Sequence, residues 1–190
     1  MRYDIVLAGV GGQGVLSVSA IVATSALKEG LLVKCSEVHG MAQRGGCVQS
    51  NLRISDAPIH SDIIPRGSAD LILGMEPVES LRYLPFLAWT GMLLTSADPV
   101  VNIPDYPDIQ EILDAVLSLP RAVLVRTGEL ARKLSAPKAG NVIMVGAASR
   151  FLPIPTSTIE STIAEMFARK GDRVVEANIR AFRAGREAVS

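Results

Sequence analysis

Glycines at the spacing G-x-G-x-x-G follow the first apolar run of the chain. Gly9, Gly11 and Gly14 come directly after the apolar residues 3–8, and a helical pattern begins at once. Glycine can adopt positive φ in such a turn, and the unpaired N–H groups and dipole of the following helix favour an anion. The candidates for a phosphate contact are therefore Gly11, Gly12, Gln13 and Gly14.

The same spacing also has a purely structural explanation. Parallel α/β proteins place glycines after their first strand because the helix and the strand must pack closely. Phosphate binding and close packing therefore both remain open from the spacing alone.

A second segment, SEVHGMAQRGG at residues 36–46, carries side chains suited to ligands or partners. Arg44 could offer a bidentate fork to a phosphate or carboxylate, and it could equally contact a partner subunit. Glu37, beside Ser36, follows a predicted strand at the place where dinucleotide-binding proteins carry a ribose-binding acid. His39 has no neighbouring nucleophile, so we expect it to order a loop or an interface. Ser36, Glu37 and Arg44 thus join the candidate cofactor-binding residues, and no catalytic residue is assigned.

Charge and cysteine content exclude several classes of protein. Nineteen Lys plus Arg balance nineteen Asp plus Glu, so no net field favours nucleic acid or an anionic membrane. Cys35 and Cys47 lack zinc or iron–sulfur spacing, so we expect no metal here and two small buried thiols. We find no signal-peptide pattern and no apolar run of about 18 residues, which predicts a cytoplasmic protein without a membrane span.

Hydrophobic periodicity predicts alternating strands and helices. The expected strands are residues 3–8, 31–35, 47–54, 69–75, 91–95 and 122–125. The expected helices are residues 14–29, a short one from 76, and then 109–119, 127–134, 142–150, 156–168 and 172–188. The alternating pattern of 47–54 indicates an edge or antiparallel strand, and residues 96–108 should form an exposed excursion. The first helix should bury Leu16, Ile21, Val22 and Leu27 and end at Gly30.

This order of elements predicts an α/β fold in a single domain spanning residues 1–190. We expect a mostly parallel three-layer α/β/α sandwich with a Rossmann-like start and a helical C-terminus. Ligands of such sheets bind beyond the carboxyl ends of the strands. The glycine turn, the segment after 31–35 and the turn at 74–76 all come at that end, so they should share one rim.

Four segments, in chain order, resemble the gamma-type subunit of 2-oxoacid:ferredoxin oxidoreductases. They are GVGGQGV at 9–15, SEVHGMAQRGG with V-x-S-x-x-R at 48–53, IPRGSADLILGMEPVE at 64–79 and NVIMVGAASRFLPIP at 141–155. The likeness spans nearly the whole chain. The segment HGMAQRGG is most similar to the beta subunit of the indolepyruvate branch of that family.

The resemblance implies a non-redox subunit that is inactive alone. Its enzyme would oxidatively decarboxylate a 2-oxoacid, such as indolepyruvate or another arylpyruvate, to an acyl-CoA. Thiamine diphosphate and iron–sulfur clusters would lie in partner chains that reduce ferredoxin. This chain would contact coenzyme A at its glycine turn and help to close the active site. In isolation its uncovered surface should make it a homodimer.

Two other functions remain open at this point. A free-standing NAD- or FAD-binding Rossmann-like module would explain the glycine spacing and Glu37, but it would not explain the segment HGMAQRGG. A ligand-free assembly subunit would explain why the sequence offers no catalytic pair.

Overall fold

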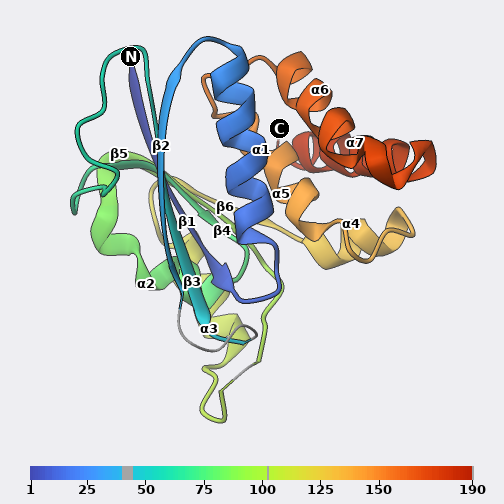
Figure 1. The fold of residues 1–190 in the computed structure, drawn as a ribbon. Helices are drawn as coiled ribbons and strands as arrows, with labels where there is room; N and C mark the ends of the chain where they lie inside the picture. Colours follow the sequence, from blue (N-terminus) through green and yellow to red (C-terminus); the bar gives the residue numbers. More distant parts are fainter. Residues whose placement is uncertain (40–44, 102, 190) are drawn as a thin grey trace.

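The computed structural model describes residues 1–39, 45–101 and 103–189, and within them a sheet of six strands forms the centre of the fold (Figure 1). The strands lie in the order β2-β3-β1-β4-β5-β6. Their bounds are β1 Arg2–Val10, β2 Leu32–His39, β3 Cys47–Ser55, β4 Ala69–Gly74, β5 Leu87–Ser96 and β6 Ala122–Val125. Strands β1, β4, β5 and β6 run parallel, whereas β3 is antiparallel to both of its neighbours.

Helices cover both faces of the sheet. The α-helices are α1 Val15–Lys28, α2 Pro77–Arg82, α3 Ile109–Leu117, α4 Thr127–Lys133, α5 Gly140–Ala148, α6 Thr156–Phe167 and α7 Asp172–Glu187. Short 3₁₀ turns are η1 Leu84–Phe86 and η2 Ala168–Lys170. Figure 1 shows α2 and α3 on one side of the sheet and α1 with α4 to α7 on the other. The predicted three-layer sandwich with a helical C-terminus is confirmed. No helix in the described ranges combines the length and apolar character needed to cross a membrane.

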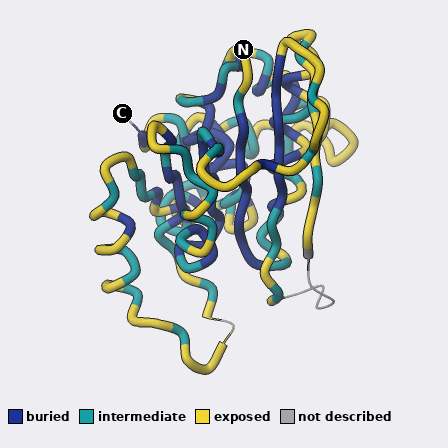
Figure 2. The backbone as a smooth tube through the Cα atoms, turned by 90° about the vertical axis from the view of Figure 1, so that its left-hand side faces the viewer, coloured by how far each residue is buried: buried dark blue, intermediate teal, exposed yellow. Residues whose placement is uncertain are grey.

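The two layers of core follow from the alternation of side chains along the central strands. Ile5 and Leu7 of β1 pack with α1, α5 and α7 in the larger cluster, whereas Val6 packs with Ile72 and Val116 on the opposite face. Because β1 and β4 are covered on both faces, they are continuous apolar runs rather than alternating ones. Figure 2 shows the resulting buried centre of the sheet.

Strand β3 is antiparallel, as predicted, but it is not an edge strand. Strand β2 forms that edge, and the polar residues Ser50, Asn51, Arg53 and Ser55 of β3 are buried because they have partners inside the fold. Arg53 donates to both carboxylate oxygens of Asp4, at 2.9 and 3.0 Å, and to the carbonyls of Ser61 and Ile63. The alternating pattern of β3 therefore reflects a buried polar network.

Helix α1 buries only part of the face predicted for it: two of the four predicted residues, Leu16 and Leu27, are exposed. Leu16 is 45% exposed and Leu27 is 58% exposed, whereas Ser19 and Ser25 are buried. The Ser25 hydroxyl donates to the carbonyl of Ile21 at 2.7 Å, so its burial leaves no unpaired group. The prediction for Ile21 and Val22 was correct, and Gly30 ends the helix region at a φ of 75°.

The prediction that both cysteines are buried is wrong. Cys35 lies in the edge strand β2 and Cys47 is the first residue of β3, and both are exposed. The apolar character of the cysteine side chain predicts burial, and it does not indicate that β2 lies at the edge of the sheet.

Candidate binding site at the glycine turn

The turn between β1 and α1 requires glycine at two positions. Gly12 has a φ of 103°, and Gly14 has a φ of 82° and forms the N-cap of α1 in the left-handed conformation. L-residues rarely adopt such angles. No hydrogen bond between described residues uses the N–H groups of Gly12 and Gly14. Both donors therefore stand at the start of a helix, where a bound anion would be favoured.

Gln13 holds this turn against the neighbouring strand. Its Oε1 accepts a hydrogen bond from the Val10 N–H at 2.7 Å, and its Nε2 donates to the Met75 carbonyl at 2.9 Å. The main-chain N–H groups of Gln13 and Gly11 are also used, toward Val10 and Gly46. Of the four predicted phosphate contacts, Gly12 and Gly14 thus have available donors, whereas Gly11 and Gln13 shape the turn.

An open pocket of about 650 Å³ lies beside the turn, within the range typical of small-molecule sites. We call it the glycine-turn pocket. Its lining residues come from the turn, the end of β4, the start of α4, and the segment leading into α5: Gly12, Gln13, Met75, Thr127, Pro137, Lys138, Gly140, Asn141 and Met144. None of them is acidic, which suits an anionic ligand.

The close approach of Gly14 to Asn141 and two hydrogen bonds to Asp98 position the wall of the pocket opposite the turn. A Cβ built on Gly14 would lie only 2.8 Å from Asn141 Nδ2, so glycine allows α1 and α5 to begin side by side. Thr127 Oγ1 donates to Asp98 Oδ2 at 2.7 Å, and the Gly128 N–H donates to the same oxygen. Asp98 thereby fixes the start of α4. Sequence reasoning did not assign Asp98, Thr127, Lys138 or Asn141 to the site.

The second sequence motif reaches the same rim. The Gly11 N–H donates to the Gly46 carbonyl at 2.8 Å, and the Gly45 N–H donates to the Gly11 carbonyl at 3.3 Å. The shared rim is confirmed for the end of that motif. Arg44 and the side chain of His39 lie outside the described residues.

The structure does not bring Ser36 and Glu37 to the glycine turn. They pair with Asn51 and Ser50 of β3, which in turn pair with Val6 and Leu7 of β1. Both residues thus lie two strands from β1, inside β2 rather than after it, because β2 continues to His39. Ser36 Oγ accepts from Asn51 Nδ2 at 3.1 Å. Neither residue lines the glycine-turn pocket.

A buried carboxylate occupies the neighbouring turn at the end of β4. Glu76 is 1% exposed, and its Oε2 accepts from the Glu79 N–H at 2.8 Å to cap α2. Its Oε1 accepts from the Tyr106 hydroxyl. Burial, and then this hydrogen bond, raise the pKa of Tyr106 well above its usual value, so the phenol keeps its proton. This hydrogen bond attaches the loop before α3, which carries Tyr106, to the carboxyl-end rim of the sheet.

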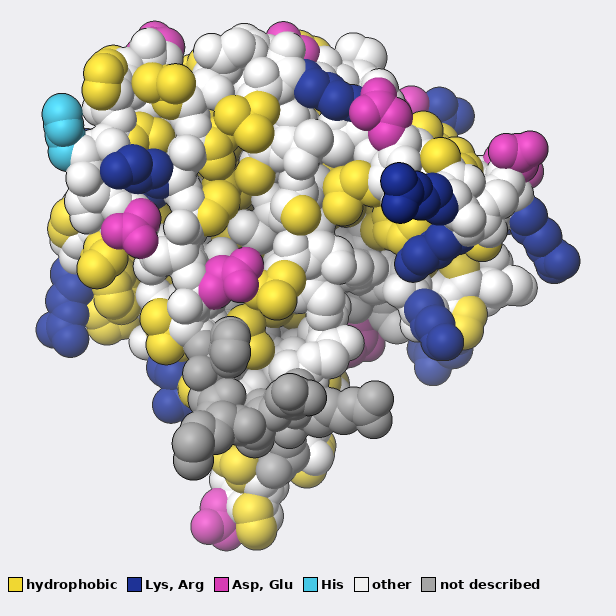
Figure 3. All heavy atoms as spheres, in the orientation of Figure 1, with side chains coloured by type: hydrophobic (Ala, Val, Ile, Leu, Met, Phe, Trp, Pro, Cys, Tyr) yellow, Lys and Arg dark blue, Asp and Glu magenta, His cyan; other side chains and the backbone are white. Residues whose placement is uncertain are grey.

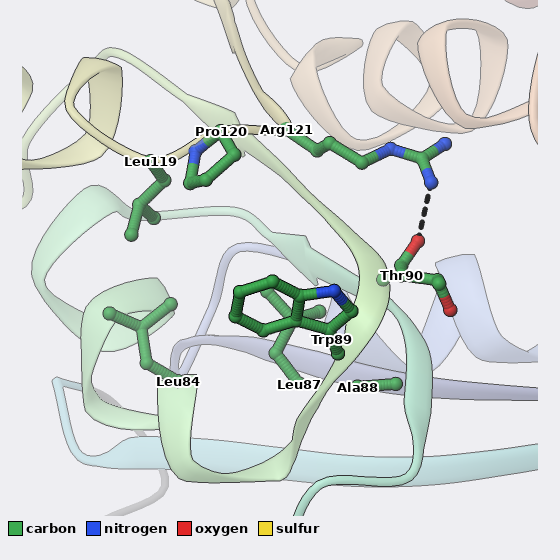
Figure 4. Close-up of a pocket in the computed structure, with 9 residues that line it drawn as sticks. Leu84, Leu87, Ala88, Trp89, Thr90, Leu119, Pro120 and Arg121 are labelled. Atoms are coloured by element: carbon green, nitrogen blue, oxygen red, sulfur yellow. Dashed lines mark hydrogen bonds between the residues drawn. The ribbon is translucent and has the colours of Figure 1, made fainter.

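A second concavity lies at the opposite end of the sheet, where β5 begins (Figure 4). It holds about 500 Å³, and we call it the Trp89 groove; Leu84, Leu87, Trp89, Leu119 and Pro120 supply its apolar lining. Trp89 is 99% exposed. A Cβ on Gly91 would lie 2.6 Å from the Ala69 carbonyl, so glycine permits the close strand passage beside this projection. An exposed apolar surface of this kind is typical of interfaces.

The parallel strands, the glycine turn and the adjoining pocket define a Rossmann-like α/β protein with a candidate binding site at the carboxyl ends of its strands. The sequence model of the family "Pyruvate ferredoxin/flavodoxin oxidoreductase" matches residues 4–188, so the chain belongs to that family. The resemblance found in the sequence is confirmed.

Similar proteins are named as subunits of enzymes that act on 2-oxoacids. The chain is 35% identical to the indolepyruvate oxidoreductase subunit IorB of Archaeoglobus fulgidus, over 97% of this chain and 94% of that protein. It is 39% identical to IorB of Methanothermobacter thermautotrophicus, over 97% and 96% respectively. It is 31% identical to the 2-oxoglutarate synthase subunit KorC of Methanothermobacter marburgensis, over 100% and 97%.

Solved structures share the fold. One is the 2-oxoglutarate:ferredoxin oxidoreductase of Magnetococcus marinus with 2-oxoglutarate, coenzyme A and succinyl-CoA bound, at a TM-score of 0.79 and 19% identity. That match covers 99% of this chain and 31% of the other. Another is the pyruvate oxidoreductase subunit PORC of Thermotoga maritima, at a TM-score of 0.75 and 24% identity, covering 100% and 97%.

Proposed function

We propose that the chain is the non-redox subunit of a thiamine-dependent 2-oxoacid:ferredoxin oxidoreductase that acts on indolepyruvate or another arylpyruvate. Two relatives with the indolepyruvate name, matched along nearly their full lengths, support the branch. Partner chains carry thiamine diphosphate and the iron–sulfur clusters and pass electrons to ferredoxin. This chain contributes a single domain that binds coenzyme A and helps to close the active site.

The observation that carries the coenzyme A assignment is the pair of available N–H donors at Gly12 and Gly14. They stand at the start of α1 and beside a pocket without acidic lining. Backbone donors at a helix start suit a pyrophosphate, and Lys138 in the same pocket adds a positive charge. A protein of the same fold has coenzyme A bound, which is consistent with this assignment.

The placement of Glu37 favours this function over a free-standing NAD- or FAD-binding module. Such a module uses an acidic side chain near the glycine turn to bind ribose. Glu37 instead lies inside β2, two strands from β1, and pairs with Ser50 of β3. The open pocket, in turn, favours ligand binding over a purely structural assembly subunit.

The test replaces Gly12 with aspartate in the complex with its partner chains. A Cβ on Gly12 would meet no heavy atom within 4 Å beyond its chain neighbours, and Gly12 lines the glycine-turn pocket, so the added carboxylate would repel an anion bound there. We expect the KM for coenzyme A to rise roughly 5- to 150-fold, or about 1–3 kcal/mol, while the KM for the 2-oxoacid stays constant.

Gly12→Asn is the matched control, because it introduces the same backbone strain and nearly the same volume without a negative charge. It should raise the KM for coenzyme A much less than Gly12→Asp does. Equal effects of the two substitutions would indicate a packing turn, and an unchanged KM in an assembled Gly12→Asp complex would refute phosphate binding there.

A further inference from the structure

Another pocket, distinct from the Trp89 groove, adjoins the glycine-turn pocket on the side of α7. It holds about 530 Å³, and we call it the cationic pocket. Its lining combines Ser17 of α1 and the segment at the start of α5 with residues around the start of α7: Ser17, Ala136, Pro137, Lys138, Ala139, Asn141, Phe167, Lys170, Arg173, Val174, Ala177 and Asn178. Pro137, Lys138 and Asn141 line both pockets, so the two form neighbouring parts of one concave surface.

Three positive charges surround this pocket without neutralising partners. Lys138, Lys170 and Arg173 are exposed, and among the described residues none of them has a carboxylate within ion-pair distance. Lys133, by contrast, pairs with Glu129 at 2.7 Å. No lining residue is acidic. Figure 3 shows Lys and Arg side chains gathered over the side of the molecule that carries α4 and α7.

The remaining lining of the cationic pocket is apolar and includes one aromatic ring. Phe167, Val174 and Ala177 supply apolar surface beside the charges. Lys170 Nζ lies 5.2 Å from the centre of the Phe167 ring, which holds the ammonium group close to that surface. A planar apolar group that carries a phosphate matches this combination, because its ring can cover the apolar residues while its phosphate contacts the cations.

We propose that the cationic pocket binds the adenine and the 3′-phosphate of coenzyme A. The inference rests on the proposed function and deepens it, since the 5′-pyrophosphate of the same molecule would lie at Gly12 and Gly14. Lys170 and Arg173 pair with the 3′-phosphate, and Lys138 stands between the two phosphate sites because it lines both pockets. The chain would thereby select coenzyme A over nucleotides and thioester carriers that lack a 3′-phosphate.

The experiment compares coenzyme A with 3′-dephospho-coenzyme A as probes in calorimetric titrations of the full chain, alone and in its complex. The wild-type chain should bind coenzyme A at least about tenfold more tightly than the dephospho form. The double variant Lys170→Gln/Arg173→Gln should lose most of that preference and bind the two probes almost equally. Both side chains are exposed, so the fold should persist, as thermal unfolding would verify.

The matched control is Lys133→Gln/Arg169→Gln. It removes the same amount of charge from two exposed residues that line neither pocket, and it should keep the preference for coenzyme A. An equal loss of preference in the control would attribute the effect to net charge and overturn the proposal.

The remaining outcomes separate this inference from the proposed function. If Gly12→Asp weakens coenzyme A binding while Lys170→Gln/Arg173→Gln keeps the 3′-phosphate preference, the glycine-turn site stands and the cationic pocket is refuted. The reverse result refutes the glycine-turn site alone. A double variant that assembles poorly with its partner chains but retains the preference would identify a docking surface and overturn the proposal. A wild-type chain that binds neither probe, alone or in its complex, overturns both.

Discussion

Gln13 Nε2 donates to the carbonyl of Met75 at 2.9 Å, which fastens the glycine turn to the end of β4. The Met75 N–H in turn donates to the Ala8 carbonyl at 2.7 Å, so β1, the turn and β4 form one connected unit. A binding turn held in this way loses little conformational freedom when a ligand arrives, which favours affinity. The glutamine of GVGGQGV is therefore explained by the structure of the turn rather than by a ligand contact of its side chain.

Replacing Gln13 with glutamate should destabilise the protein by about 1–3 kcal/mol, because a carboxylate cannot donate to the Met75 carbonyl and leaves a partly buried acceptor unpaired. Urea unfolding measures the change. Gln110→Glu on the exposed face of α3 is the control and should stay within about 0.5 kcal/mol of wild type. A Gln13→Glu protein as stable as the control would show that the amide contacts do not hold the turn.

Arg53→Met should cost about 3–5 kcal/mol of unfolding free energy, because Asp4 is fully buried and would lose its bidentate partner. Arg2 Nε, 3.3 Å from Asp4 Oδ2, offers limited compensation because it is largely exposed. The double variant Asp4→Leu/Arg53→Met should be less destabilised than the sum of the two single variants. Additive effects in denaturant unfolding would contradict a coupled buried pair.

Gly146→Ala should be strongly destabilising, since a Cβ there would lie 1.9 Å from the Phe182 carbonyl of α7. Helices α5 and α7 can cross this closely only without side chains at the contact. We expect a loss of at least about 2–3 kcal/mol. Gly140→Ala meets open space at the start of α5 and should be neutral or slightly stabilising. The midpoints of thermal unfolding of the two variants measure this difference. Equal midpoints would argue against the close crossing of α5 and α7.

The periodicity of the sequence was sufficient for the sheet and most helices, but not for the buried face of α1. Strand β6 and the start of α7 fall where the pattern placed them. In α1, apolar residues such as Val15, Leu16 and Val18 surround the helix axis, so no single stripe is defined. The buried face of α1 carries Ser19 and Ser25. The Ser25 hydroxyl donates within the helix to Ile21, whereas Ser19 accepts from the Ser50 hydroxyl of β3, a partner that only the folded chain supplies.

The glycine turn is the part of the candidate site that could be predicted from the sequence. The glycine turn is a local feature, because its conformation depends on the glycines themselves. Thr127 and Asn141 stand more than a hundred residues further along the chain, and only the packing of α4 and α5 beside α1 brings them to the pocket. Ser36 and Glu37 were misplaced because polar residues looked like the end of β2, whereas an edge strand tolerates them.

The stability of the protein should fall at alkaline pH through Tyr3. Burial, and then the charge of Asp70, raise the pKa of Tyr3 from 10.0 to about 12, against a smaller opposing effect of Arg121. The folded state thus keeps the phenol proton longer than the unfolded state does. Its contribution is complete below pH 10 and is lost as pH rises toward about 12. Tyr3→Phe should be less sensitive over this range in unfolding titrations; an identical pH dependence would contradict the assignment.

The isolated chain should self-associate as a homodimer through the Trp89 groove, because Trp89 is 99% exposed among apolar neighbours. Trp89 is also the only tryptophan of the chain, so its fluorescence should shift from a hydrated to a shielded emission as concentration rises. Trp89→Ser should weaken the dimer at least about tenfold, since exposed aromatic residues tend to dominate interface energies.

Val101→Ser is the control for that experiment, because Val101 is 70% exposed and does not line the groove. Light scattering across a concentration series would follow both variants, and only Trp89→Ser should shift the chain toward monomer. A wild-type chain that stays monomeric at high concentration would contradict self-association. A dimer weakened equally by the two substitutions would place the contact elsewhere on the surface.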